Sequence, residues 1–270
     1  MQTSRTRTLR VCFTMDCEQV AAHQGGPPTW EYGERSIRGF CEALLAQGMG
    51  ATLFVVPVGA EKYRAALADL AGAGQSHMLS EAKVQWTQAL GREPLVVRPG
   101  NFSANDATFP VLAGLGFLAS SASCPLRNFI DAKANWTGAP LDPHFTHAAN
   151  RLLAGDLPLF EAPLTVDWES FMWGGRTPLE LRIEMVDARA HGYTVRKAVK
   201  RQLDSGIPES VLVVLTHSVF DYSDPAEFRR QVLDGLIAEI RRTAELHEIA
   251  VRSTTLLELR EIHLEEGVGP

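Results

Sequence analysis

The sequence lacks the features that define several common classes of protein. No apolar run approaches the length of about 20 residues that a membrane-spanning helix requires, and no apolar signal-peptide core follows the basic, polar segment Met1–Arg10. The four cysteines have neither zinc-finger nor Cys-x-x-Cys spacing. We therefore expect a cytoplasmic protein with free thiols and no transmembrane segment.

An excess of positive charge is also missing. The chain has 26 Lys and Arg against 32 Asp and Glu, which gives a net charge of −6 at pH 7 and a pI near 5.8. This balance argues against nucleic acid or an anionic membrane as the main partner. Local basic runs such as Arg196-Lys197 and Lys200-Arg201 lie at helical spacing and are typical of a solvated helix face.

No linker-like break divides the 270 residues, and a hydrophobic content of 45% is enough for a sizeable core. We therefore expect one domain over residues 1–270. The apolar patterns predict strands over Val11–Asp16, Ala51–Val56, Pro94–Val97, Phe117–Ser121, Leu159–Val166, Val211–Leu215 and Ile249–Val251. They predict helices over Glu34–Gln47, Gly59–Leu70, Gln75–Leu90, Asn105–Leu115, Pro178–Ala190, Thr194–Leu203, Asp224–His247 and Thr254–Arg260.

Repeated strand-then-helix units predict an α/β protein with a parallel sheet. The glycine-rich phosphate fingerprint of many doubly wound sheets is absent after the first strand, which favours a barrel over an open sheet. The long segment Cys124–Gly155 has no clear period, and an irregular segment of this length usually has a functional reason.

Polar residues recur at the ends of the predicted strands. Asp16 and Glu18 end the first strand, one residue apart, and Arg98 and His217 follow later strands. Each residue alone is more typical of a structural role, such as an arginine paired with an acid or a hydrogen-bonded core histidine. Because the carboxyl ends of parallel strands converge, the four together predict a site with a base, a metal ligand, an orienting cation and a group that titrates near neutrality.

Four motifs, in this order along the chain, resemble those of the polysaccharide deacetylases, carbohydrate esterase family 4. They are Thr14-Met15-Asp16-Cys17-Glu18, Arg98-Pro99-Gly100, Asp167-Trp168 and Leu215-Thr216-His217-Ser218. The resemblance spans most of the chain, from about Val11 to His217. It implies a distorted (β/α) barrel of about seven parallel strands with the active site at the C-terminal strand ends. It also implies removal of an acetyl group from an N-acetylated sugar or glycan precursor by a divalent metal, with zinc expected and cobalt, nickel or manganese as alternatives.

Carried over residue by residue, the resemblance makes Asp16 the catalytic base and Arg98 the residue that orients it. His217 becomes the general acid, and Glu18 the metal ligand because Cys17 occupies the usual position of that acid. Leu215 would line the acetyl pocket. Asp167 would pair with the histidine at the substrate site, and Trp168 or Trp173 would wall a sugar groove, although a half-buried structural tryptophan is the commoner finding.

The family's two metal histidines are not present where they are expected, after the glycine-rich segment that ends at Gly74. Two successive helices without an intervening strand fall at the same place, so topology and motif both indicate a seam between Gly74 and Gln75. Residues omitted from the printed sequence, a deletion, or a divergent member without its metal site would each explain it; we favour omission. His77 lies within a predicted helix and is more typical of a surface or packing residue.

Two other functions remain open. A glycosidase using carboxylates such as Asp16, Glu161 or Glu169 would explain the acids but leaves Arg98 and the Leu-x-His strand end without a role. A metal-free barrel that only binds glycans or scaffolds a partner is the non-catalytic alternative. The sequence specifies neither the sugar nor the oligomeric state, and a homo-oligomer is compatible with it.

Overall fold

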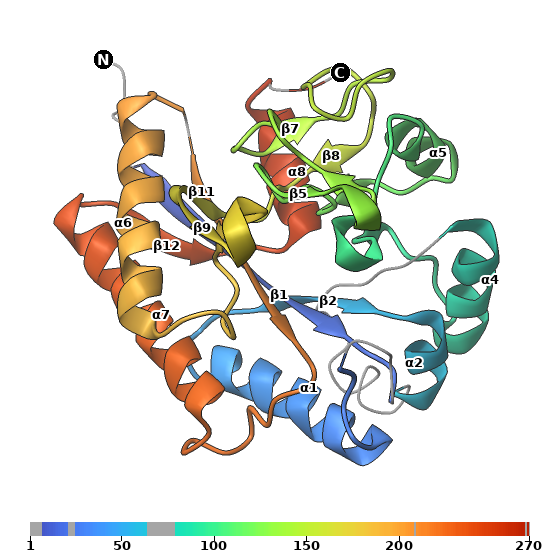
Figure 1. Ribbon diagram of the computed structural model, residues 1–270, viewed down its shortest axis with the longest axis horizontal. Helices are drawn as coiled ribbons and strands as arrows, with labels where there is room; N and C mark the ends of the chain where they lie inside the picture. Colours follow the sequence, from blue (N-terminus) through green and yellow to red (C-terminus); the bar gives the residue numbers. More distant parts are fainter. Residues whose placement is uncertain (1–6, 21–24, 64–78, 208, 268, 270) are drawn as a thin grey trace.

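The structure is a computed structural model that describes residues 7–20, 25–63, 79–207, 209–267 and 269. Its helices are α1 (Trp30–Leu45), α2 (Pro57–Lys62), α4 (Leu79–Leu90), α5 (Thr108–Gly114), α6 (Ala188–Asp204), α7 (Phe228–Leu246) and α8 (Leu256–Glu265) (Figure 1). Its strands are β1 (Thr8–Cys17), β2 (Ala51–Val55), β3 (Val96–Val97), β4 (Ala119–Ser120), β5 (Asn128–Phe129), β6 (Ala134–Asn135), β7 (His144–Phe145), β8 (Phe160–Glu161), β9 (Val166–Met172), β10 (Thr177–Glu180), β11 (Ser210–His217) and β12 (Ala250–Ser253). None of the helices described is long and apolar enough to cross a membrane.

Strand β1 is the centre of the main sheet. It pairs in parallel with β11 along one edge, while β12 pairs with its N-terminal half and β2 with its C-terminal half along the other edge. The β1–β11 register runs from Leu9 opposite Ser210 to Asp16 opposite His217. The pairing therefore places these two polar residues side by side at the carboxyl end of the sheet.

Alternation along β1 and β11 separates the two hydrophobic clusters of the core. Leu9, Val11, Phe13 and Met15 of β1 pack with apolar residues of α1, α6 and α7, which lie on the same side of the strands in Figure 1. Residues of the opposite parity, such as Cys12 of β1 and the Val211, Val213 and Leu215 set of β11, belong to the second cluster. Because side chains two residues apart on a strand share a face, Asp16 and His217 lie on the face of the sheet that packs against the second cluster.

A second sheet, in the order β3-β4-β8-β7, has three parallel strands and one antiparallel strand. Residues 181–183 bridge toward the main sheet, since Leu181 and Ile183 exchange backbone hydrogen bonds with Leu215 of β11 at 3.0 and 2.9 Å. The α/β fold is confirmed, but the sheets do not close into a barrel. The strands β3, β4 and β8 pair over only two residues each, and within the described residues no ladder joins β2 to β3.

The prediction of a helix over Pro178–Ala190 is wrong. Thr177–Glu180 forms β10, antiparallel to β9, and Leu181–Ile183 then lies beside β11. A turn in which the N–H of Met185 donates to the Arg182 carbonyl at 2.9 Å follows, and α6 begins at Ala188. The helix predicted over Thr194–Leu203 lies within α6. The proposed seam between Gly74 and Gln75 and the residue His77 lie outside the described residues.

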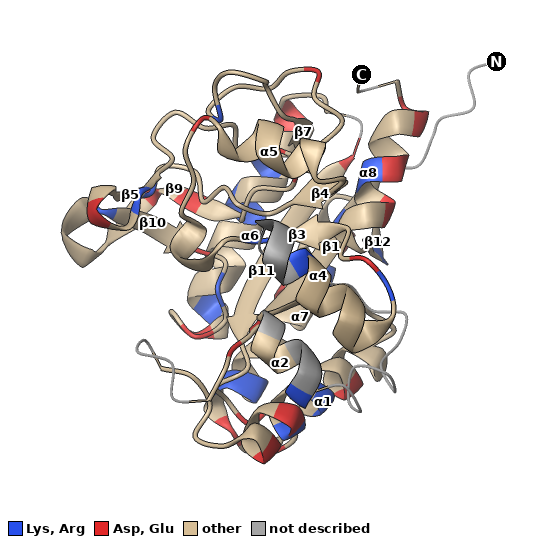
Figure 2. Cartoon of the chain, turned by 90° about the vertical axis from the view of Figure 1, so that its right-hand side faces the viewer, with Lys and Arg blue, Asp and Glu red and all other residues tan. Residues whose placement is uncertain are grey.

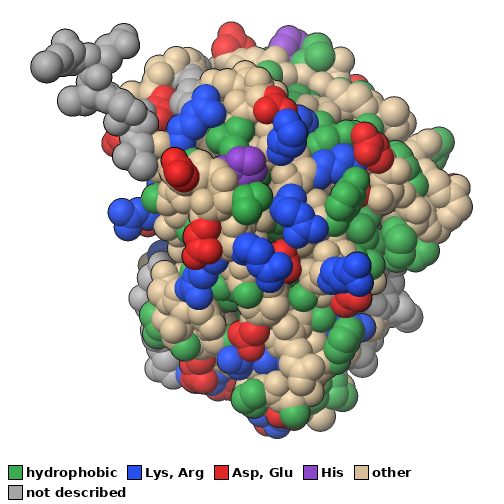
Figure 3. All heavy atoms as spheres, turned by 90° about the vertical axis from the view of Figure 1, so that its left-hand side faces the viewer, with side chains coloured by type: hydrophobic (Ala, Val, Ile, Leu, Met, Phe, Trp, Pro, Cys, Tyr) green, Lys and Arg blue, Asp and Glu red, His purple; other side chains and the backbone are tan. Residues whose placement is uncertain are grey.

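Charged residues of both signs are interspersed over the ribbon in Figure 2, and on the face of the molecule in Figure 3 basic and acidic side chains alternate without forming a basic patch. The basic runs of α6 have acidic partners: Arg196 lies 2.9 Å from Glu239, and Arg201 and Lys200 pair with Asp142 and Asp204. The four cysteines are free, and three of them are buried.

Candidate active site

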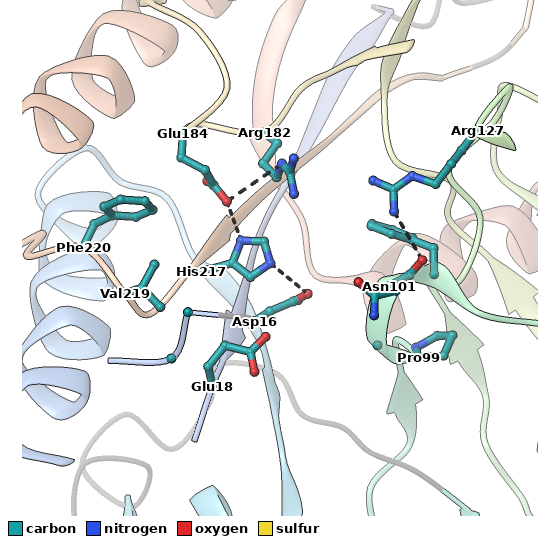
Figure 4. Close-up of a pocket in the computed structure, with 14 residues that line it drawn as sticks. Asp16, Glu18, Pro99, Asn101, Arg127, Arg182, Glu184, His217, Val219 and Phe220 are labelled. Atoms are coloured by element: carbon teal, nitrogen blue, oxygen red, sulfur yellow. Dashed lines mark hydrogen bonds and ion pairs between the residues drawn. The ribbon is translucent and has the colours of Figure 1, made fainter. Parts of the chain in front are cut away.

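A pocket of about 430 Å³ opens at the carboxyl ends of β1 and β11 (Figure 4). Its walls come from four parts of the chain: Asp16 and Glu18 at the end of β1, the loop Pro99–Phe102, the segment between β10 and α6 that carries Arg182 and Glu184, and the segment from His217 to Phe220. Gly25, Gly26 and Arg127 complete the lining. Of the residues predicted from sequence, Asp16, Glu18 and His217 line this pocket together, with Arg98 directly behind Asp16.

Arg98 fixes the orientation of Asp16. Its Nη1 donates to Asp16 Oδ1 at 2.8 Å and to the Thr14 hydroxyl at 3.0 Å, while Nε and Nη2 donate to the backbone carbonyl and hydroxyl of Ser121 at 3.2 and 2.9 Å. The guanidinium also lies 4.3 Å from the centre of the Phe54 ring. The Arg98 side chain is only 1% exposed whereas Asp16 is 22% exposed, so the arginine holds the carboxylate from behind and leaves it open to the pocket.

His217 faces Asp16 from the neighbouring strand. Its Nε2 lies 3.8 Å from Asp16 Oδ2, and its Nδ1 hydrogen-bonds to Glu184 Oε1. The other oxygen of Glu184 accepts from the hydroxyl of Thr216 at 3.1 Å. Figure 4 shows the imidazole between the two carboxylates, with Nε2 directed at Asp16.

Burial and pairing act in opposite directions on this histidine. Burial lowers the pKa of His217, but the Glu184 carboxylate bonded to its ring and the charge of Asp16 outweigh this, so the pKa lies above its usual value. Burial likewise raises the pKa of Glu184, but His217 and Arg182 more than offset it and keep the pKa of this carboxyl low. The pair therefore favours a protonated imidazole against an ionised carboxylate.

The prediction that Asp167 pairs with the histidine is wrong, because Glu184 takes that place. Asp167 is buried in β9, where it accepts a hydrogen bond from Ser170 at 2.7 Å and pairs with Lys197 of α6. Burial raises the pKa of Asp167, but these hydrogen bonds outweigh it and lower the pKa below its usual range. Asp167 and His217 thus belong to separate networks.

Two further predicted residues do not line the pocket. Leu215 is fully buried in the second hydrophobic cluster. The ring of Trp168 lies under Lys197, whose Nζ is 4.4 Å from the ring centre. Trp173 does not line the pocket either; it is 52% exposed, its ring stacks on Phe129 with centres 5.9 Å apart, and its ring centre lies 5.5 Å from the guanidinium carbon of Arg182.

The backbone of Glu18 is fixed by hydrogen bonds to two side chains. Its N–H donates to the hydroxyl of Ser218 at 2.9 Å, and its carbonyl accepts from the Tyr63 hydroxyl at 3.0 Å. Burial raises the pKa of Glu18, repulsion by Asp16 adds to this effect, and His217 partly opposes it. Such a carboxylate binds a proton more readily than usual and gains from a nearby cation.

The described residues do not by themselves form a metal site. Asp16 and Glu18 supply two carboxylates, but no group of three or more His, Cys, Asp or Glu side chains within the described ranges could hold an ion. His23 and His77 lie outside those ranges. A structural zinc site takes four protein ligands and a catalytic one three, so the acids alone do not fit the metal that the family resemblance implies.

The loop after Arg98 carries local strain. Asn101 and Phe102 both have positive φ angles, 55° and 58°, a conformation that non-glycine residues seldom adopt. Arg127 fixes this loop, because its Nη1 donates to the Asn101 carbonyl at 3.2 Å and its guanidinium lies 4.6 Å from the centre of the Phe102 ring. Arg127 is in turn paired with Glu180, which also accepts from Thr177 at 2.7 Å.

The carboxylates named for a glycosidase lie apart from Asp16. Glu161 is fully buried and accepts a hydrogen bond from the backbone N–H of Ser123 at 2.8 Å. Glu169 is 67% exposed on β9 and lies 2.8 Å from Lys197. Neither lines the pocket.

Sequence reasoning missed Glu184 and Arg182 because a helix was predicted over their segment. The available signal was strict alternation: Leu179, Leu181 and Ile183 are apolar, and Glu180, Arg182 and Glu184 between them are charged. This period of two is typical of a strand with one buried face.

An oriented carboxylate thus faces a carboxylate-bound imidazole at the ends of two parallel strands, an arrangement that suits general acid–base chemistry. Comparison with protein-family profiles gives no match, and no curated protein matches the sequence. Solved structures do match over nearly the whole chain. A protein from Mycobacterium smegmatis described as a polysaccharide deacetylase superposes with a TM-score of 0.65 at 16% identity, over 100% of this chain and 95% of its own.

A protein from Pseudomonas aeruginosa PAO1, described in the same terms, gives a TM-score of 0.62 at 12% identity, over 97% of this chain and 93% of its own. The resemblance to the polysaccharide deacetylases is therefore confirmed for the fold. Identities this low establish the fold alone.

Proposed function

We propose that the chain is a hydrolase that removes an acetyl group from an N-acetylated sugar or glycan precursor. The observation that carries this proposal is the opposition of Asp16 and His217 in one pocket, each held by its own partner: Arg98 behind the acid and Glu184 behind the imidazole. Hydrolysis of an amide needs a base for the attacking water and an acid for the leaving amine, and the two residues match these roles.

In this proposal Asp16 takes the proton from the water that attacks the acetyl carbonyl. Its second oxygen faces the pocket and is available for this role, because Arg98 bonds only to Oδ1 and His217 Nε2 lies 3.8 Å from Oδ2, beyond hydrogen-bond distance. His217 then transfers its Nε2 proton to the nitrogen of the departing amine, and the Glu184 carboxylate, which raises the pKa of His217, favours the protonated imidazole that this step needs. Acetate and the free amine are the products.

A divalent cation, with zinc expected, belongs to the same proposal, and Glu18 is its proposed ligand. The acidic pair at the strand end supports this assignment, and the remaining ligands must come from beyond the described residues. Measuring bound metal after purification, and repeating the assay with a chelator and then with added Zn²⁺, tests the cation separately from the acid–base pair.

The decisive test is acetate release from N-acetylated sugars by the purified chain. Replacement of Asp16→Asn keeps the shape but removes the base, and we expect the rate to fall about 10²- to 10⁴-fold. Glu169→Gln is a matched control, because this exposed carboxylate does not line the pocket, and it should leave the rate unchanged. Cleavage of glycosidic bonds, or sugar binding without acetate release, would refute the proposal in favour of a glycosidase or a glycan-binding protein.

A further inference from the structure

Three arginines surround the pocket, and two of them are committed to the protein itself. Arg98 uses Nε, Nη1 and Nη2 on Thr14, Asp16 and Ser121. Arg127 donates to Glu180 and to the Asn101 carbonyl. These contacts hold the base and the strained loop, so both guanidinium groups have evident structural roles.

Arg182 differs from the other two. Its side chain is 16% exposed and lines the pocket, yet within the described residues it donates no hydrogen bond. Its Nε lies 3.4 Å from Glu180 Oε2 and 3.9 Å from Glu184 Oε1, which are ion-pair contacts without hydrogen-bond geometry. Together with the Trp173 ring 5.5 Å away, these contacts hold the arginine in place and leave the fork of its two terminal nitrogens unused.

Of the two acids near Arg182, Glu184 already has closer partners, because it is bonded to His217 and Thr216. Glu180 bonds Arg127 and Thr177 through Oε1, while its Oε2 has Nε of Arg182 as its ion-pair partner at 3.4 Å. In Figure 4, Asp16 and Glu18 lie on one side of His217, Glu184 and Arg182 lie on the other side, and Arg127 lies apart from them near Asn101. A substrate whose scissile bond lies at Asp16 and His217 and which extends past the imidazole would reach Arg182.

We propose that Arg182 binds a negatively charged group of the substrate, a carboxylate or a phosphate, and thereby selects anionic N-acetylated sugars. This inference rests on the proposed function, because it assumes that the pocket holds an N-acetylated sugar. The planar guanidinium matches the geometry of either anion with two parallel N–H donors. An ammonium group at the same place supplies the charge but not this paired geometry.

The experiment compares substrates that differ only in charge. Acetate release is measured from N-acetylglucosamine, its 1-phosphate, its 6-phosphate and its uronic acid, with wild type, Arg182→Gln and Arg182→Lys. Arg176→Gln is the matched control: it carries the same change on an exposed arginine that lies 5.6 Å from the centre of the Phe129 ring and does not line the pocket. We expect wild type to prefer at least one anionic sugar by kcat/KM.

In Arg182→Gln that preference should fall about 10- to 100-fold, the range of a charge-assisted hydrogen bond, mainly through KM. Arg182→Lys should restore it only in part, and Arg176→Gln should retain it. Acetate release from all four sugars at equal efficiency would overturn the inference and leave the proposed function standing. A preference that Arg182→Gln retains would overturn it as well.

Binding is measured separately by calorimetry with glucuronate and, as the neutral comparison, glucose. We expect glucuronate to bind wild type at least about tenfold more tightly than glucose, and Arg182→Gln to abolish the difference. If this holds while no sugar releases acetate, the proposed function fails and the anion site stands. Equal binding of the two probes would refute the anion site whatever the activity.

Discussion

Replacing Arg98 by methionine tests whether this buried side chain both stabilises the fold and positions the base. The change removes a charge-assisted hydrogen bond to Asp16 and three bonds to Thr14 and Ser121, and these tie β1 to the strand ends of the second sheet. The first bond contributes about 1.5–3 kcal/mol and each of the others about 0.5–1.5 kcal/mol. Because such terms are not additive, we expect a loss of about 3–5 kcal/mol, the range for breaking one partner of a buried pair.

A loss of this size is a large part of the free energy of unfolding of a typical protein, about 5–15 kcal/mol. It corresponds to a fall in Tm of about 6–20 °C at about 2–4 °C per kcal/mol. Urea unfolding followed by circular dichroism measures the loss directly. The folded fraction should also release acetate about 10²-fold more slowly, because Asp16 is no longer held toward the pocket.

The matched control is Arg176→Met. Arg176 is 55% exposed and lies 3.3 Å from Asp131, which is 89% exposed, so its replacement should change the free energy of unfolding by no more than about 0.5 kcal/mol. If the free energy of unfolding of Arg98→Met lies within about 1 kcal/mol of that of Arg176→Met, the size of a single neutral hydrogen bond, the four bonds of Arg98 do not stabilise the fold.

Two further predictions concern the acid and the helix that supports the site. Acetate release should decline as pH rises through the elevated pKa of His217. Glu184→Gln removes the charge that raises this pKa, so it should move the decline to lower pH and slow the reaction at pH 7 about 10²-fold. A decline at the same pH in both proteins would exclude His217 as the acid. Gly39→Ala in α1 should lower Tm, because its Cβ would lie 2.2 Å from the backbone nitrogen of Ser223 and 2.5 Å from the carbonyl carbon of Tyr222. Gly114→Ala, where a Cβ meets no atom within 4 Å, should be neutral or slightly stabilising, and equal Tm values for the two variants would contradict the close packing of α1.

Much of the site could be predicted because its main residues end long apolar strands. Val11–Asp16 and Val211–His217 have a single consistent pattern, and both form continuous strands with every residue of one opposite a residue of the other. Once two such strands pair in parallel, the residues that end them on one face must lie together. Local sequence therefore sufficed to bring Asp16 and His217 to one place.

The part that could not be predicted depends on competition between two periodicities. Residues 178–190 contain enough apolar positions to suggest an amphipathic helix, but pairing with β9 and the backbone hydrogen bonds of Leu181 and Ile183 with Leu215 keep the first residues of the segment extended. The contact with β11, which is distant in sequence, places the following turn so that Glu184 reaches the imidazole. Asp167 was misplaced for the same reason, because its partner Lys197 lies 30 residues away on α6.

Barrel closure also depended on interactions that the sequence pattern does not specify. The apolar runs around β3, β4 and β8 predict strands of four residues or more, but only two residues of each are paired. In a closed barrel one edge of β1 would pair with β2 along its whole length. Here β12 pairs with the first half of that edge and β2 with the second half. The number of paired residues and the choice of neighbouring strand depend on the whole sheet, so they could not be predicted from the sequence of a single segment.

The ladder between β1 and β11 continues past the strands themselves, since Ser218 donates its backbone N–H to the Asp16 carbonyl at 2.9 Å and its hydroxyl accepts from the N–H of Glu18 at 2.9 Å. The proposed base and acid thus lie opposite each other in one continuous ladder, and the separation of their backbones is set by strand pairing and not by the surrounding loops. Insertions, losses or exchanges in those loops can then alter what the pocket admits without disturbing the pair. Such a division gives an evolving lineage, or a protein engineer, a fixed reaction centre around which new specificities can be assembled.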